Sequence, residues 1–244
     1  TNLEKIILPN SLKEIGAYAF YDCRKLGSNN NYVELHHVKK VDVGAFMSCY
    51  SVENDIKYGL TRIDLGDSLE EIGDSAFEND QLLVDNKNTA DPTTEPATPD
   101  TYEFIIPKTV TKIGARAFFN TFRFALADVT GNAKIIFDHE EGEPCNLKEV
   151  GESAFEEMGV SSQTMTTHHE YNKSFQIDIN LCSFTLKKIP NRMFYLTYLG
   201  IIDNFPGDTL EEVGEYAFYY VYGKSPTKIE LKENVKTIGK YAFY

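Results

Sequence analysis

Residues 3–23 read LEKIILPNSLKEIGAYAFYDC. This stretch ends in a short phrase, from Ile15 to Phe20: an aliphatic residue, Gly, two variable residues, a small residue and Phe. The same phrase returns with its Gly at residues 72–77, 113–118, 150–155, 213–218 and 238–243. Two degraded copies, at residues 41–46 and 189–194, carry Asp42 or Pro190 in place of the Gly. Self-similarity of this kind indicates a protein built from stacked repeats.

The spacing of the phrase gives the size of the repeat and the positions of its insertions. The phrase ends on eight phenylalanines, which are Phe20, Phe46, Phe77, Phe118, Phe155, Phe194, Phe218 and Phe243. The shortest spacing, 24 residues from Phe194 to Phe218, approximates one unit. Longer spacings predict polar insertion loops, which we place near residues 85–101, 119–131, 139–146 and 159–173. With these loops, residues 1–244 are expected to form a single domain.

A second pattern precedes most copies of the phrase: two apolar residues flank one outward position. It occurs at residues 6–8, 33–35, 63–65, 104–106, 135–137, 177–179 and 229–231. A period of two predicts a strand whose outer pair faces the core. We therefore expect one short strand per repeat, stacked in parallel on its neighbours.

The order of these features is similar to that of a known family. The segment Leu3–Cys23 matches LxxIxLPxSLxxIGxxAFxxC almost position by position, and the chain resembles the BspA-like leucine-rich repeats of bacterial and protist surface proteins. The resemblance implies a mostly β member of the α/β-type leucine-rich-repeat class: a curved, right-handed solenoid of about eight repeats with few or short helices. The chain departs from this pattern at residues 199–206, where the strand register is ambiguous, and the Cys is lost after the first two repeats.

Stacking explains the residues that recur. An isolated unit near 24 residues cannot bury its apolar side, so each repeat is stabilised by its neighbours. The Phe side chains are expected to form one apolar column through the core. The Gly of the phrase is needed either because the chain adopts a turn conformation there, or because another backbone segment approaches so closely that a side chain would block it.

Charge and hydropathy exclude several classes of function. The formal net charge is -13 and the isoelectric point about 4.9, so phosphate backbones would be repelled and no nucleic-acid partner is expected. No apolar run approaches the roughly 20 residues that cross a bilayer, and residues 1–10 lack a basic start followed by an apolar stretch. We expect no membrane insertion by this segment. An extracellular or cell-surface location is implied by the family resemblance.

The sequence offers little that indicates chemistry. The acidic pairs Glu70-Glu71 and Glu211-Glu212 share one variable slot of the repeat, which favours a solvated surface. The histidine pairs at residues 36–37 and 168–169 lack any metal-binding motif around them. We therefore expect no enzyme activity, no metal and no cofactor. Cys23 and Cys49 occupy equivalent slots, where buried thiols are favoured and a disulfide is left open.

The outward strand positions form a candidate binding strip. These positions are Ile7, Glu34, Asp64, Ile105, Ile136, Asp178 and Glu230. Ile105 and Ile136 are adjacent in this series and are flanked by acidic residues. Exposed aliphatic residues on a concave sheet can mark a contact site, but they also simply favour strand formation, and both interpretations stand.

Our leading hypothesis is a non-catalytic secreted or cell-surface bacterial protein for protein recognition or adhesion, with a protein or surface glycan as ligand. One alternative is a structural spacer within a larger surface protein. Another is a protein that binds or acts on glycans through its insertions. End-to-end self-association of the repeats is a further expectation.

Overall fold

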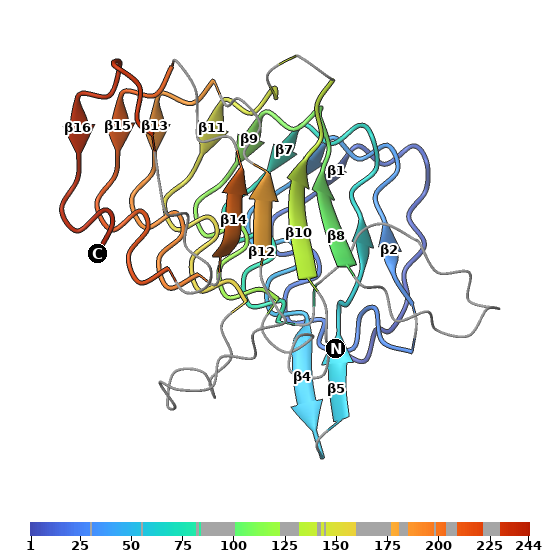
Figure 1. Cartoon of the computed structure of the whole chain (residues 1–244). Coiled ribbons are helices and arrows are strands. Elements are labelled where there is room, and N and C mark those ends of the chain that lie inside the picture. The colour runs from blue at the N-terminus through green and yellow to red at the C-terminus, as the bar shows by residue number, and fades with distance from the viewer. Residues whose placement is uncertain are drawn as a thin grey trace.

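A computed structural model of the chain describes all residues except 30, 55, 82, 84–100, 123–131, 141–142, 144, 160–176, 181–184, 198, 204–208 and 222–229. The described part contains sixteen strands, β1 to β16, and no helix. Successive turns of the chain lie side by side from the N-terminus to the C-terminus, and the strands form two rows (Figure 1). The expected leucine-rich-repeat architecture of parallel strands is confirmed at this level.

The first row contains the strands that the alternating pattern predicts. Its members are β2 (Val33–Glu34), β6 (Ile63–Asp64), β8 (Thr101–Ile106), β10 (Asn132–Phe137), β12 (Ile177–Asn180) and β14 (Leu199–Asp203). Parallel pairing joins β2 to β6, and joins β8, β10, β12 and β14 in that order. Phe104 and Ile106 are buried while Ile105 between them is half-buried, so the outer apolar pair does face the core.

The expectation of one strand per repeat is wrong, because a second row runs alongside the first. It comprises β1 (Glu14–Ile15), β3 (Lys40–Val41), β7 (Glu71–Ile72), β9 (Lys112–Ile113), β11 (Glu149–Val150), β13 (Lys188–Ile189), β15 (Glu212–Val213) and β16 (Thr237–Ile238). The first five form one parallel sheet and the last three another. Each strand consists of one polar residue and the aliphatic residue of the phrase, and is too short to show a period of two.

Three further differences concern single strands. Residues 6–8 are not in a strand, and Glu230 and Leu231 are not in one either, although the pattern predicts strands there. An antiparallel hairpin that the sequence did not predict joins β4 (Tyr50–Glu53) to β5 (Ile56–Gly59) and projects from one edge of the molecule (Figure 1). Of the predicted insertion loops, those near residues 85–101, 119–131 and 159–173 lie largely outside the described residues, and the one near 139–146 lies partly outside them.

The phenylalanines of the phrase stack into one column, which confirms the expected core. Ring centroids of successive members, from Phe20 to Phe243, lie 5.1–5.7 Å apart, with interplanar angles of 27° or less. The rings from Phe46 to Phe194 are 0–1% exposed, whereas Phe243 is 42% exposed. Offset stacking at such separations adds to the stabilisation from burial.

The turn around each Phe has a repeated backbone conformation. The residue two before the Phe has φ of 52–59° in all eight copies, and the residue two after it has φ of 45–65° in the seven copies that have one. In this left-handed conformation, the N–H groups of these residues and of the Phe point the same way, toward the next repeat. Phe46, for example, donates to the carbonyl of Ala76, and Ser48 donates to that of Glu78. The hydrogen bonds between repeats offset the cost of left-handed side-chain-bearing residues.

Candidate binding surface

The register of the first row tests how the predicted strip aligns. Glu34 pairs with Asp64, and Ile105 pairs with Ile136. The next position along this line is Asn180, which pairs with Ile136 and with Asp203 of β14. Asp178 pairs instead with Lys134, two residues earlier on β10. Asp178 therefore lies two residues along the strand from the predicted line, because the alternating pattern does not define the register of a strand.

The two ends of the predicted strip are not part of a sheet. Ile7 is 83% exposed and lies outside any strand. Glu230 is also exposed and outside any strand. Among the predicted residues, Glu34, Asp64, Ile105 and Ile136 therefore lie on paired strands at the predicted positions, and Asp178 lies on a paired strand but out of register.

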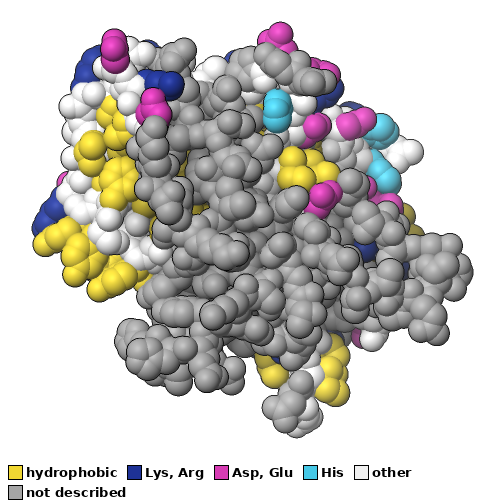
Figure 2. All heavy atoms as spheres, viewed as in Figure 1, with side chains coloured by type: hydrophobic (Ala, Val, Ile, Leu, Met, Phe, Trp, Pro, Cys, Tyr) yellow, Lys and Arg dark blue, Asp and Glu magenta, His cyan; other side chains and the backbone are white. Residues whose placement is uncertain are grey.

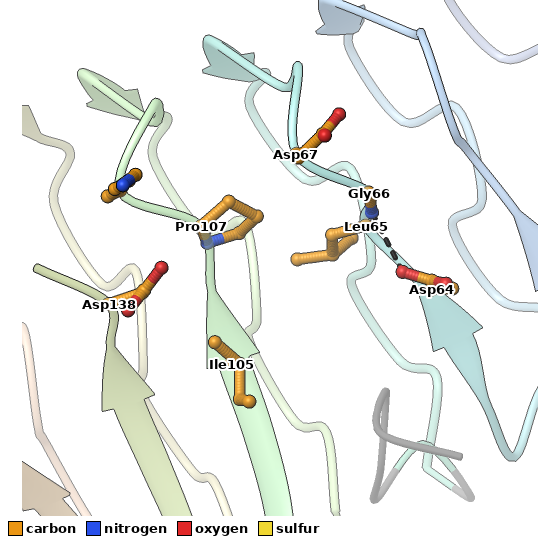
Figure 3. A pocket seen from close by; sticks show the side chains of 8 residues that line it. Asp64, Leu65, Gly66, Asp67, Ile105, Pro107 and Asp138 are labelled. Atoms are coloured by element: carbon orange, nitrogen blue, oxygen red, sulfur yellow. Dashed lines mark hydrogen bonds between the residues drawn. The ribbon is translucent and has the colours of Figure 1, made fainter.

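The strip is interrupted between β6 and β8, which belong to different sheets. An open hollow of about 220 Å³ lies at this interruption. Figure 3 shows Asp64, Leu65, Gly66 and Asp67 on one side of it, Ile105 and Pro107 on the other, and Asp138 beyond Pro107. Two strip residues predicted from the sequence, Asp64 and Ile105, thus face a common space.

The remaining polar residues of the hollow lie one to three residues after the end of a strand. Asp67 follows β6, Lys108 follows β8 and Asp138 follows β10. Loop positions at strand ends commonly carry binding residues. This was the signal in the sequence for Asp67 and Asp138, which the sequence analysis missed because it considered only the strand positions themselves.

Two carboxylates of the hollow, those of Asp64 and Asp67, have local hydrogen bonds but no ion pair among the described residues. The backbone N–H of Gly66 donates to Oδ1 of Asp64 at 2.8 Å, and the Ser68 hydroxyl donates to Oδ1 of Asp67 at 3.0 Å. Gly66 has φ of 66°, and a Cβ there would lie 2.5 Å from the carbonyl oxygen of His36. This glycine therefore allows the tight turn that holds Asp64.

The cation that lines the hollow is paired outside it. The ammonium of Lys108 forms an ion pair with Glu140. Their hydrogen bond raises the pKa of Lys108 and lowers the pKa of Glu140. Figure 2 shows hydrophobic side chains next to Asp and Glu side chains on this face of the molecule. The hollow therefore combines an apolar floor with a negatively charged rim.

A second hollow lies at the first repeat, where residues 6–8 are not paired. It measures about 340 Å³, and its lining includes Ile7, Tyr32, Glu34 and His36. The ring of His36 lies 3.6 Å from the carboxylate of Glu34. This hollow, too, has an aliphatic residue on one turn and a carboxylate on the next.

The residues that could have carried other chemistry have structural partners. Among the described residues, no three His, Cys, Asp or Glu side chains are placed to hold a metal ion. Cys23 and Cys49 are buried free thiols, as favoured from the sequence, and Cys145 is disulfide-bonded. Burial raises the pKa of the Cys49 thiol well above its ordinary value, which opposes formation of the thiolate.

The acidic pairs of the repeat form ion pairs between neighbouring turns. Lys39 lies 2.6 Å from Glu70, and Lys112 lies 3.2 Å from Glu71. Lys236 lies 2.7 Å from Glu211. These side chains are largely exposed, so each pair contributes little to stability. Their solvated positions agree with the interpretation from the sequence.

The fold and these surfaces define a leucine-rich-repeat protein, and comparison with known families is more specific. The model of the BspA type leucine rich repeat region matches in six copies, over residues 1–85, 143–224 and 187–244. The chain therefore belongs to the BspA type leucine-rich-repeat family. In the described part, no helix is long and apolar enough to span a bilayer.

A solved structure of a leucine-rich repeat protein from Bacteroides ovatus ATCC 8483 is similar to the chain, with 19% sequence identity and a TM-score of 0.48. The match covers 95% of this chain and 50% of the solved one. The chain therefore spans about half the length of that protein. No curated protein matches the chain.

Proposed function

We propose that this chain is a non-catalytic recognition module of a secreted or cell-surface bacterial protein, and that it binds a partner protein on the strip around Ile105. In this proposal the repeats form a right-handed, curved solenoid of about eight units. The column of eight stacked Phe rings supports such an arrangement. Membership of a family whose members are usually surface interaction modules supports the class of function.

The observation that carries the proposal is the hollow between β6 and β8. Protein interfaces commonly have an apolar centre surrounded by polar groups. Ile105 and Ile136 pair with each other and remain half-buried rather than covered, while Asp64, Asp67 and Asp138 surround Ile105 at the hollow. The disulfide at Cys145 supports the proposed location, because disulfides persist in oxidising compartments.

Binding to an array of purified host and bacterial surface proteins tests the proposal. We expect Ile105→Asp and Ile136→Asp each to weaken the affinity for a captured partner by about tenfold or more, since a buried charge replaces an apolar contact. Ile56→Asp is the matched control, because Ile56 is 55% exposed on β5, in the hairpin rather than in the strip.

Circular dichroism of all three variants checks that the fold is retained. The control variant should bind as the unmodified chain does. Affinity unchanged by both strip substitutions, or reduced equally by the hairpin substitution, would contradict recognition through the strip.

A further inference from the structure

We infer that the hollow between β6 and β8 receives a cationic side chain, arginine or lysine, from a basic segment of the partner protein. This inference rests on the proposed function and specifies the chemistry of the partner. It follows from three properties of the hollow: its apolar floor, its uncompensated charge and the spacing of its carboxylates.

The apolar floor suits the stem of a long cationic side chain. Leu65, Ile105 and Pro107 line the hollow from both sides of the interruption in the strip (Figure 3). Arginine and lysine pack their methylene stems along apolar surface while their charged ends stay near polar groups. The volume of about 220 Å³ is sufficient for one such side chain but not for a folded element.

Part of the negative charge around the hollow is uncompensated within the described part of the chain. Asp64 and Asp67 have no ion-pair partner there, while the lining cation Lys108 is paired with Glu140 and also interacts electrostatically with Asp138. The chain as a whole carries a formal charge of -13, which favours the approach of a basic segment.

The spacing of the carboxylates distinguishes a side chain from a metal ion. Asp64, Asp67 and Asp138 do not converge closely enough to form a metal site. Asp64 and Asp67 lie on one side of the opening, and Asp138 lies beyond Pro107 (Figure 3). A guanidinium or an ammonium group has several donors that point in different directions and can reach separated acceptors. The arrangement therefore fits a larger organic cation.

Titration of the isotope-labelled chain, followed by amide NMR, tests the inference. The probe is the acetylated and amidated pentapeptide Gly-Gly-Arg-Gly-Gly, and the matched probe replaces its arginine with neutral citrulline. We expect saturable shifts of the Gly66 and Ile105 amides with the arginine peptide and none with the citrulline peptide. Gly66 reports directly because its N–H donates to Asp64.

Variants then locate the charge that is responsible. Asp64→Asn and Asp138→Asn should each weaken binding of the arginine peptide by about threefold, the scale of one exposed ion pair. Glu152→Gln, which removes an exposed carboxylate in a Phe turn, should leave binding unchanged. The inference would be overturned if the citrulline peptide gave equal shifts, or if the shifts were distributed over acidic residues elsewhere. It would also be overturned if neither Asp64→Asn nor Asp138→Asn changed the binding of the arginine peptide.

The peptide titration can fail while the proposed function holds, and the partner-binding test can fail while the cationic side chain is retained. Loss of partner binding in Ile105→Asp, without any response of Gly66 to the arginine peptide, would retain the function and reject the cationic side chain. A clear response of Gly66, with partner binding that does not depend on Ile105, would reject recognition through the strip and retain the cation-binding hollow.

Discussion

The glycine of the repeated phrase shows at the scale of one residue why the motif recurs. A Cβ on Gly151 would lie 2.2 Å from the backbone nitrogen of Ala115, in the preceding repeat. Equivalent distances to backbone atoms are 2.7 Å at Gly73 and 2.4 Å at Gly114. None of these three glycines has a positive φ. Of the two roles that the sequence left open, close approach of the backbones is therefore the correct one.

Gly16, in the first repeat, has no atom within 4 Å of such a Cβ and provides a matched control. We expect Gly151→Ala to lower the free energy of unfolding by about 1–3 kcal/mol, because backbone atoms must move to admit the methyl group. Gly16→Ala should leave it unchanged or raise it by up to about 1 kcal/mol through the unfolded chain. Urea denaturation of both variants measures the difference. Equal effects at the two sites would contradict the role of close packing.

Asp80 is an acidic residue inside the core. It follows its Phe at the position that Cys23 and Cys49 occupy in the first two repeats, and it is 0% exposed. Its Oδ1 accepts the N–H of Cys49 at 2.7 Å, while Oδ2 has no hydrogen-bond partner among the described residues. Burial raises the pKa of Asp80 well above its ordinary value, and the bond from Cys49 opposes this only in part.

This raised pKa makes stability depend on pH. The pKa of Asp80 is higher in the folded chain than in the unfolded chain, so the folded state binds the proton more tightly. The free energy of unfolding is therefore highest below the unfolded pKa. It decreases as the pH rises from the unfolded pKa to the folded pKa. Within that window, the unfolding free energy falls by up to about 1.4 kcal/mol per pH unit. Asp80→Asn should flatten this dependence in urea denaturation from pH 4 upward. Asp67→Asn, at an exposed position, should not, and parallel curves for Asp80→Asn and the unmodified chain would refute the assignment.

At the scale of structural elements, two arginines join neighbouring turns in the same way. Arg192 contacts Glu156 through two hydrogen bonds of 2.9 and 2.5 Å, and its guanidinium lies 3.8 Å above the ring of Tyr195. Arg116 contacts Glu78 through bonds of 3.0 and 2.7 Å and lies 3.7 Å above Phe119. Both glutamates are nearly buried. Each arginine therefore supplies the hydrogen bonds of a carboxylate that has little access to water.

Removing one of these arginines should be costly. We expect Arg192→Ala to lower the free energy of unfolding by about 3 kcal/mol, because Glu156 would remain buried without its partner. Arg192→Lys should recover only part of this loss, since an ammonium cannot reproduce the two-bond contact or the stacking. Arg24→Ala, which removes an exposed pair with Asp22, serves as the control and should leave the free energy of unfolding nearly unchanged. Thermal and urea unfolding measure all three, and equal losses for Arg192→Ala and Arg24→Ala would contradict this account.

What could be predicted from sequence depends on the length of each element. The strands near residues 33–35, 63–65, 104–106, 135–137 and 177–179 each show an apolar pair around an outward residue, and all are present. Strands such as β7, with one polar and one aliphatic residue, contain no measurable period and were missed. For the hollow, Asp64 and Ile105 were predictable from alternation. Asp138 was not predictable from alternation, because it follows β10 and does not occupy an outward position within a strand.

At the scale of the whole molecule, one apolar cluster extends from Ile15 to Ala242. Each internal repeat packs against two neighbours, whereas the first and last repeats of this chain pack against one. Exposure follows this difference: Phe77 and Phe155 are 0–1% exposed, while Phe243 is 42% exposed. Stability in such arrays is approximately a sum of repeat and neighbour contributions.

Hydrogen exchange should therefore show a gradient along the chain. We expect the slowest exchange in the Phe turns near residues 72–80 and 150–158, and faster exchange at residues 12–20 and 237–244, as followed by mass spectrometry. A single gradient of this form would also support one domain over residues 1–244. Two separate protected blocks, with an interior repeat that exchanges first, would contradict both expectations.

The left-handed Phe turns make the two faces of every repeat chemically unlike. At each internal turn the N–H groups point toward the next repeat and donate to its carbonyl oxygens, as Phe194 donates to Ala217 and Leu196 to Tyr219. Two copies joined along this edge by a twofold axis would place donors against donors or acceptors against acceptors. Association end to end along the turns is therefore expected to be head to tail, and a contact of that kind builds a ring or an open filament rather than a twofold dimer.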